Sequence, residues 1–302
     1  MCAKTLNNSS NITAHIVAFL TIAVWGTTFV WTKLLLMQGL SPAHIFTLRF
    51  LIAYLLLLGY TLVGKPQKMP FRWRDELTMA GLGLTGGSLY FLTENASMLF
   101  TTATNTSLIV CACPLFAMLL IALCYPKTER LNRHGVTGSL LALIGMAIVV
   151  LNGHFVLHLS PLGDLLAFAA CMSWAVYSLL MKRVSGKFST LYITRKMFFY
   201  GLLSILPYYF FVPELPPMSL LLRPSVWVNL LFLGCVASMV CYLTWNWCMM
   251  KLGAVTATNW VYFNPITTIF FAWLILDEHI TPYFLIGTAC ILCGIYLCSA
   301  KR

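Results

Sequence analysis

The chain has 302 residues, of which 60% are hydrophobic and only 9% are charged. Roughly a quarter of the residues in a soluble domain are charged, so this composition excludes a soluble protein and indicates an integral membrane protein. The net charge of +11 does not indicate a nucleic-acid partner, because the basic residues lie in short loops between apolar segments rather than on one face or tail.

Apolar stretches of ~20 residues, the length that crosses the hydrocarbon layer, predict ten membrane-spanning helices. In chain order they cover residues 13–36, 44–63, 76–99, 104–124, 133–152, 162–184, 191–211, 226–250, 255–276 and 281–299. No loop between them is long enough for a soluble domain. The sequence therefore predicts an all-α, multi-pass membrane protein.

Loop charges predict the orientation of these helices. With the amino terminus in the cytoplasm, 14 loop or terminal Lys and Arg residues face the cytoplasm and only Arg223 faces outward. Positive charges concentrate on the cytoplasmic side of membrane proteins, so both termini are expected in the cytoplasm. The protein itself is expected in the cell inner (cytoplasmic) membrane.

An internal repeat organises the chain. Residues 82–114 align without a gap to residues 233–265, with nine identical pairs in 33. The correspondence extends on both sides to the pairs Trp25/Trp174, Gly138/Gly287 and Gly145/Gly294. We expect two repeats, residues 1–152 and 161–302, of five helices each. Because five is odd, the second repeat enters the membrane from the opposite side, so the repeats are inverted.

Glu94 is the first candidate for a functional side chain. It lies in a long apolar stretch, and its partner in the repeat is Trp245 rather than a second carboxylate. An ionisable group inside the membrane is costly and therefore indicates function. Glu94 is expected to pair with Lys33 or Arg49, to carry a proton, or to bind a cationic group of a substrate. A purely structural buried salt bridge is the alternative.

Lys33, Arg49, Arg195 and Lys196 lie nearer the helix ends. Such side chains commonly anchor a helix at the membrane interface or pair with loops, and that interpretation is favoured over substrate contact. Arg49 is kept as a candidate because it could pair with Glu94.

Amides and prolines supply further candidates. Asn95 and Asn246 coincide in the repeat alignment, and Asn259, Tyr262 and Asn264 are concentrated in the ninth predicted span. Each Asn can simply bond a neighbouring helix, but together they could line an aqueous path. Pro114 and Pro265 coincide as well, and paired helix breaks in corresponding helices are typical of a binding site between repeats, although a kink without a ligand is the alternative.

Aromatic and small residues complete the pattern. The matched Trp25 and Trp174 lie well inside their spans and are predicted to contact substrate, whereas other span aromatics such as Tyr90 and Tyr242 are interpreted as core or interfacial residues. Glycines that recur at seven residues, at 138 and 145 and at 287 and 294, predict close helix packing. The eleven cysteines have no partner ligands at metal-binding spacing, so no metal or cofactor is expected.

In order along the chain, these features resemble the EamA family of the drug/metabolite transporter superfamily. The resemblance rests on Trp25-Gly26, Pro42 followed by Arg49-Phe50, Ala103 to Pro114 and Glu129-Arg130-Leu131 in the first repeat, and on Trp174, Gly253-Ala254 to Pro265 and Leu276-Asp277-Glu278 in the second. It implies an inverted five-plus-five fold with a central cavity that transports small metabolites, amino acids or drugs.

The predicted function is secondary transport of such a solute by alternating access of a cavity between the repeats, with the lipid bilayer as environment and protons as a candidate coupling ion. No P-loop is present, and the protein is not expected to be an enzyme. The alternative is an intramembrane enzyme acting on a lipid-linked substrate, which would need a nucleophile, a metal cluster or paired carboxylates. The sequence leaves the substrate, the direction of transport and the oligomeric state open.

Overall fold

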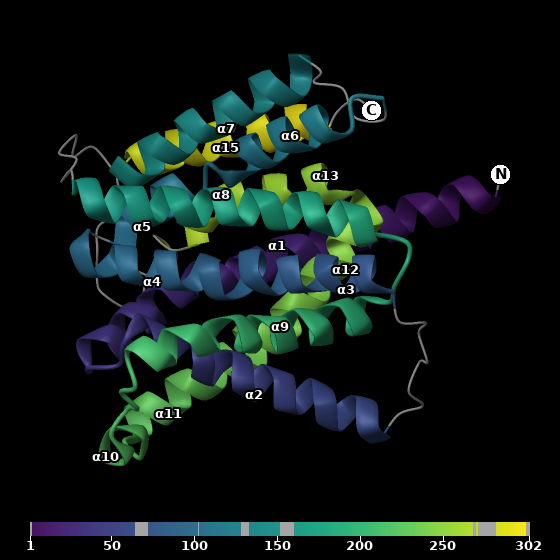
Figure 1. Cartoon of the computed structure of the whole chain (residues 1–302). Helices are drawn as coiled ribbons and strands as arrows, with labels where there is room; N and C mark the ends of the chain where they lie inside the picture. Colours follow the sequence, from purple (N-terminus) through teal and green to yellow (C-terminus); the bar gives the residue numbers. More distant parts are fainter. Residues whose placement is uncertain are drawn as a thin grey trace.

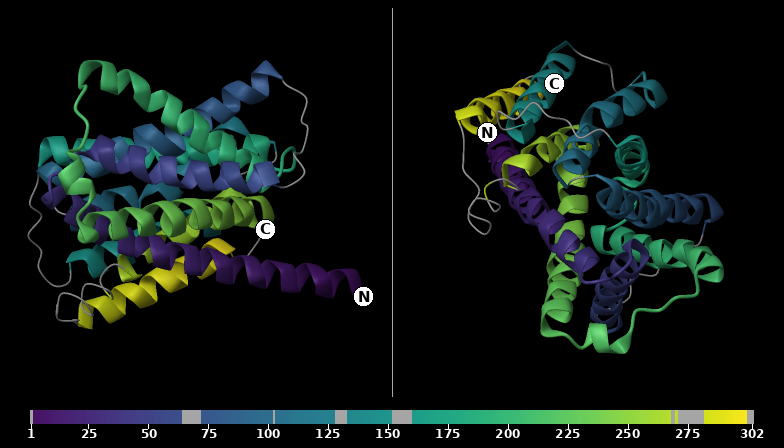
Figure 2. Two further views of the ribbon diagram at one scale, coloured as in Figure 1. Left: turned by 90° about the horizontal axis from the view of Figure 1, so that it is seen from below. Right: turned by 90° about the vertical axis from the view of Figure 1, so that its left-hand side faces the viewer.

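The structure is a computed structural model that describes residues 2–63, 72–101, 103–127, 133–151, 160–267, 270 and 282–299. Within these residues the chain forms helices and no strand, which confirms the all-α prediction (Figures 1 and 2). The Glu129 and Glu278 motifs, the end of the predicted ninth span at residues 271–276 and the start of the tenth at 281 lie outside the described residues.

The helical elements follow the predicted spans closely. They are α1 (Cys2–Met37), α2 (Pro42–Val63), α3 (Trp73–Gly83), η1 (Leu84–Ser88), α4 (Leu89–Phe100), α5 (Ala103–Val110), α6 (Cys113–Cys124), α7 (Arg133–Leu151), α8 (Pro161–Val184), α9 (Thr190–Phe211), α10 (Met218–Leu221), α11 (Pro224–Leu231), η2 (Phe232–Val240), α12 (Cys241–Leu252), α13 (Ala254–Thr258), η3 (Asn259–Phe263) and α15 (Pro282–Ser299).

Four stretches among the described residues are long and apolar enough to cross a membrane by themselves. They are Ile12–Met37, Pro42–Val63, Pro161–Val184 and Pro224–Leu252. The outer surface is apolar too, with Phe210, Phe211 and Leu215 each at least 80% exposed. Most helices run along one common direction, and the start of α1 lies on the same side of the bundle as the end of α15 (Figure 1). An apolar exterior of this kind fits a lipid environment.

Two long helices contain π-helical segments at corresponding positions. In the stretch from α3 to α4 the segment is η1, and in the stretch from α11 to α12 it is η2. The repeat alignment places residues 84–88 opposite residues 235–239, inside η2. A π-helical turn disturbs the regular pairing of backbone carbonyls, which then need other donors in an apolar bundle.

Side chains from the other half of the chain donate to those carbonyls. The Ser173 hydroxyl donates to Thr85 O at 2.7 Å, and the Tyr242 hydroxyl donates to Gly86 O at 2.7 Å. In the corresponding segment η2, Ala237 O accepts from Trp25 Nε1 at 2.8 Å. The two π-helical segments therefore fix Trp25 and Tyr242 at the centre of the bundle.

Pro114 and Pro265 each lie next to a break or a change in helical structure. Helix α5 ends at Val110, and α6 begins at Cys113 with Pro114 in its first turn, where the missing N–H costs nothing. In the ninth span, the 3₁₀ segment η3 ends at Phe263, and α-helical residues resume at Asn264 and Pro265. The helix is thus broken before Pro114, and its type changes just before Pro265.

The prediction of glycine-mediated packing is confirmed between α7 and α15. A Cβ on Gly138 would lie 2.6 Å from Gly294 O, and a Cβ on Gly145 would lie 2.7 Å from Gly287 O. A comparable approach joins α3 to α9, where a Cβ on Gly83 would lie 2.6 Å from the Gly201 nitrogen. Backbones this close leave room for no side chain.

Gly138→Ala is expected to lower the apparent Tm of the purified protein, because its methyl group would meet the backbone of α15 at Gly294 O and at Cys298 N, 2.8 Å away. Overpacking of this kind costs about 1–3 kcal/mol. The control is Gly59→Ala in α2, where an added Cβ meets nothing within 4 Å. An equal Tm for both variants would show that the seam between α7 and α15 is not tightly packed.

Candidate functional site

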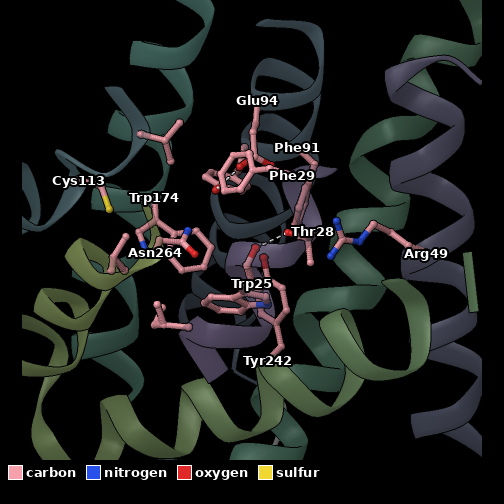
Figure 3. Close-up of a pocket in the computed structure, with 14 residues that line it drawn as sticks. Trp25, Thr28, Phe29, Arg49, Phe91, Glu94, Cys113, Trp174, Tyr242 and Asn264 are labelled. Atoms are coloured by element: carbon pink, nitrogen blue, oxygen red, sulfur yellow. Dashed lines mark hydrogen bonds between the residues drawn. The ribbon is translucent and has the colours of Figure 1, made fainter. Parts of the chain in front are cut away.

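A cavity lies at the centre of the bundle, where helices from both halves of the chain converge (Figure 3). Its lining comes from α1, α2, α4, α5, α6, α8, α12, η3 and the α-helical residue Asn264 that follows η3. The lining residues are Ile22, Trp25, Thr28, Phe29, Arg49, Tyr90, Phe91, Glu94, Val110, Cys113, Trp174, Tyr242, Val261 and Asn264.

Aromatic rings form one wall of the cavity. Trp25 and Trp174, which correspond in the repeat, meet edge to face with ring centroids 5.4 Å apart. Trp25 also contacts Tyr242 at 5.4 Å, and Tyr90 contacts Trp174 at 4.9 Å. Rings at such distances interact favourably and present a rigid apolar surface to a ligand. The structure thus brings the two predicted tryptophans together.

Glu94 lies at the same cavity and is 7% exposed. Its Oε1 accepts a hydrogen bond of 2.7 Å from the Tyr90 hydroxyl, one turn earlier in α4. The expected ion pair with Lys33 or Arg49 is absent from the described residues, and the Lys33 ammonium instead donates to Met98 O at 2.8 Å. The hypothesis of a structural salt bridge at Glu94 is therefore wrong, because neither cation reaches the carboxylate.

Arg49 faces the cavity from α2 and is 2% exposed, so its side chain lies inside the bundle rather than on the outer surface. Its Nε donates to the Ser238 hydroxyl at 2.9 Å, and its guanidinium carbon lies 4.3 Å from the centre of the Phe91 ring. Only Nε is engaged by these hydrogen bonds, which leaves further N–H donors on the guanidinium group. Figure 3 shows Arg49 and Glu94 well separated around the cavity, with Phe91 between them.

The paired amides Asn95 and Asn246 lie outside the cavity lining. Asn246 accepts from the Tyr177 hydroxyl and donates to Thr194 Oγ1 at 2.9 Å, so it links α12 to α8 and α9. Asn95 donates to Pro42 O at 3.4 Å and thereby approaches the start of α2. Both contacts are interhelical hydrogen bonds, the structural alternative considered for these residues.

Of the three candidates in the ninth predicted span, Asn264 lines the cavity and Asn259 and Tyr262 do not. Asn259 and Tyr262 share one face of η3, but Val261 and Asn264 line the cavity. Asn259 and Tyr262 are buried elsewhere in the bundle. Residues three apart are eclipsed in a 3₁₀ segment, so Asn259 and Tyr262 lie on one face of η3, and that face is not the one that lines the cavity.

The cavity is small in this conformation. Its volume is about 30 Å³, which leaves room for one or two water molecules. Sites that hold small organic ligands measure roughly 300–1,000 Å³. A solute can therefore enter only after the surrounding helices move apart. Among the described residues, no group of three or more His, Cys, Asp or Glu side chains is placed to hold a metal ion.

Comparison with known proteins identifies the family. The profile of the EamA-like transporter family matches this chain twice, over residues 12–151 and over residues 161–300. The chain belongs to the EamA-like transporter family. It is accordingly a membrane transporter, as predicted from the resemblance.

Several similar proteins carry transporter names. An uncharacterized transporter of Archaeoglobus fulgidus is 25% identical over 97% of this chain and 99% of its own length. A probable amino-acid metabolite efflux pump of Escherichia coli is 25% identical over 93% of each chain. A probable terminal-alkyne amino-acid exporter of Streptantibioticus cattleyicolor is 24% identical over 76% of this chain and 75% of its own length.

A solved structure described as "Crystal structure of protein" shares the fold of this EamA-like chain. It superposes with a TM-score of 0.75 at 21% identity and covers 95% of this chain and 98% of that chain. The similarity concerns the fold and carries no information on the substrate.

Several lining residues of this EamA-like cavity escaped the sequence analysis. The sequence predicts Tyr90 and Tyr242 to be core or interfacial aromatics, and it does not single out Thr28, Phe29 or Phe91 as ligand contacts. A usable signal was present for Tyr90, because it lies one turn before Glu94 on the same helix face. No comparable signal marks Tyr242, whose place depends on the carbonyl of Gly86 in a distant π-helical segment.

Proposed function

We propose that this protein is a secondary transporter for a small zwitterionic solute of the amino-acid class, which it moves by alternating access of the central cavity. In this proposal the ranges 1–152 and 161–302 are inverted repeats of five spans each. Both termini face the cytoplasm, and the protein resides in the inner membrane. The solute gradient, with protons as the candidate coupling ion, supplies the driving force.

Features shared by the two halves support the repeat architecture. The family profile matches each half, and the segments η1 and η2 coincide in the repeat alignment. Gly83 and Gly234 also coincide in the alignment, and each lies against a helix of the other half of the chain. A Cβ on Gly83 would meet Gly201 in α9, and a Cβ on Gly234 would lie 2.8 Å from Ile52 Cβ in α2. Cavities between such repeats are typical of secondary transporters.

The observation that carries the substrate class is the pair of opposite charges in one cavity. Arg49 and Glu94 are both buried, and within the described residues neither has an ion-pair partner within 4.0 Å. Removing an ion from water costs several kcal/mol unless an opposite charge compensates it. A zwitterion compensates both, since its carboxylate can accept from the guanidinium N–H groups while its ammonium donates to Glu94.

The rest of the cavity suits the remainder of such a molecule. The rings of Trp25, Trp174 and Tyr242 offer an apolar surface, while Thr28 and Asn264 add polar groups. An apolar or aromatic side chain is therefore favoured over a charged one. The names of the efflux pump of Escherichia coli and the exporter of Streptantibioticus cattleyicolor support the same class.

The enzymatic alternative has less support. Glu94 is the one carboxylate among the lining residues, whereas hydrolysis by carboxylates needs a pair. The small volume of the cavity is consistent with a site that widens when a solute binds, as the proposed transport cycle requires.

A panel of one amino acid and its blocked derivatives tests the proposal. The purified protein in liposomes should exchange phenylalanine or leucine across the membrane in a counterflow assay. The methyl ester lacks the carboxylate and the N-acetyl derivative lacks the ammonium, so each is expected to compete about tenfold less well. Equal competition by the free amino acid and either derivative would refute recognition of a zwitterion. If neither phenylalanine nor leucine is exchanged, the proposed substrate class is refuted.

A further inference from the structure

A second cavity lies away from the central site, between α2 and α9. Its volume is about 280 Å³, and it is lined by Tyr54, Leu58, Arg195, Lys196 and Phe199. Figure 1 shows α2 diverging from α9 toward the side of the bundle on which α1 begins. The cavity therefore combines two cations with aromatic and aliphatic side chains in a place that the transport proposal does not use.

One of the two cations is already neutralised. The Lys196 ammonium donates to both carboxylate oxygens of Glu76 in α3, at 2.9 and 3.0 Å. The hydroxyls of Tyr200 and Tyr192 also donate to this carboxylate, the latter at 3.4 Å. Glu76 is thereby saturated with donors, and the cluster as a whole is neutral.

Arg195 has no such compensation. Its Nη1 donates to the Thr61 hydroxyl in α2 at 3.0 Å, and within the described part of the chain no carboxylate lies within 4.0 Å of it. A guanidinium group carries five N–H donors, of which this contact uses one. The cavity thus presents one net positive charge with unused donors in a planar array that suits a phosphate group.

The depth of this charge matches the headgroup region of a membrane. Helix α9 begins at Thr190, so Arg195 lies about 7–8 Å along it, and Thr61 lies about 3 Å from the end of α2 at Val63. Both helix ends belong to the side on which loop Lys and Arg residues concentrate, the expected cytoplasmic side.

The surroundings of the cavity face lipid rather than an aqueous path. Leu55, Phe199 and Leu203, on the two helices that form the cavity, are 54%, 41% and 48% exposed. Apolar side chains exposed on the flank of a membrane bundle contact acyl chains. An anion that approaches from this flank is therefore attached to a lipid, and basic pockets between helices on the cytoplasmic side are known to bind lipid headgroups.

We propose that this cavity binds one anionic phospholipid of the cytoplasmic leaflet. Its phosphate accepts hydrogen bonds from Arg195, Tyr54 adds a hydroxyl donor to the same cavity, and the acyl chains lie along the exposed apolar residues of α2 and α9. Bound there, the lipid fills the space between the diverging helices and holds α2 against α9.

Native mass spectrometry of the purified full-length protein tests this proposal with two lipids that have the same acyl chains. The protein is offered equal amounts of palmitoyl-oleoyl phosphatidylglycerol and phosphatidylcholine. The wild type is expected to retain phosphatidylglycerol about fivefold over phosphatidylcholine, and Arg195→Gln to lose this preference. Leu58→Trp should lose it too, because the larger side chain fills the cavity without changing the charge.

The matched control is Arg183→Gln, which removes the same charge from an exposed position near the end of α8. It should keep the preference. An unchanged preference in Arg195→Gln, or an equal loss in Arg183→Gln, would overturn the proposal. Inorganic phosphate that raises the Tm as much as phosphatidylglycerol does would also overturn it, because the site would then recognise a free anion rather than a lipid.

Discussion

Glu94→Gln is expected to reduce solute flux by about tenfold or more while leaving the Tm unchanged or raised. The glutamine carbonyl can still accept the hydrogen bond from the Tyr90 hydroxyl that Glu94 now accepts at 2.7 Å. The substitution removes only the buried charge, whose desolvation opposes folding. Loss of flux without loss of stability would separate a functional carboxylate from a structural one.

Flux in liposomes and thermal unfolding in detergent are measured on the same preparation. Glu214→Gln is the control, because it makes the same chemical change on an exposed side chain. Normal flux in Glu94→Gln would remove Glu94 from the site. If the flux of the wild type depends on pH and the residual flux of the variant does not, Glu94 is the group that carries the coupled proton. A pH dependence of flux in Glu94→Gln equal to that of the wild type would exclude that role.

Arg49→Lys is expected to raise the apparent KM for a zwitterionic solute by about tenfold, even though the charge is kept. Lysine cannot reproduce the planar contact with Phe91 at 4.3 Å while also donating to Ser238 and to a carboxylate. Ser238→Ala removes only the hydrogen bond that orients the guanidinium group, so a smaller rise is expected.

Binding of the methyl ester and of the N-acetyl derivative can be measured for both Arg49→Lys and Glu94→Gln. If the carboxylate of the solute contacts Arg49, the methyl ester should bind Arg49→Lys and the wild type equally. If the ammonium contacts Glu94, the N-acetyl derivative should bind Glu94→Gln and the wild type equally. If instead the methyl ester is unaffected by Glu94→Gln and the N-acetyl derivative is unaffected by Arg49→Lys, the solute binds in the reverse orientation. If each substitution weakens binding of the free amino acid and of both derivatives equally, direct contact with the substituted residue is excluded.

The sequence was sufficient for the helices because apolar length and the internal repeat are one-dimensional signals. The same repeat singled out Trp25 and Trp174, which the structure places in contact. The sequence could not predict the burial of Arg49, because the distance of a residue from the helix end says nothing about the helix face on which it lies. It is close to the start of α2, yet its side chain points into the bundle and is buried.

The sequence did not predict which face of the ninth span lines the cavity. Asn259 and Tyr262 do share a face, but that face is turned away from the cavity, and only packing against other helices decides this. The positions of Trp25 and Tyr242 depend on carbonyls of two π-helical segments. Such segments have no recognisable sequence signature, so the polar contacts that fix the aromatic wall could not be predicted.

The distribution of the two cavity charges over the repeats has a consequence for how a solute can sit. The aromatic wall draws on both halves of the chain, but Arg49 and Glu94 both belong to the first, and the alignment places Trp245 opposite Glu94. An assembly of two identical half-chains would offer each charge twice and accept a solute in two equivalent poses. With the charges confined to one half, the proposed site is expected to hold a polar solute in a single pose, so we expect the same end of the molecule to lead at every crossing in a given direction.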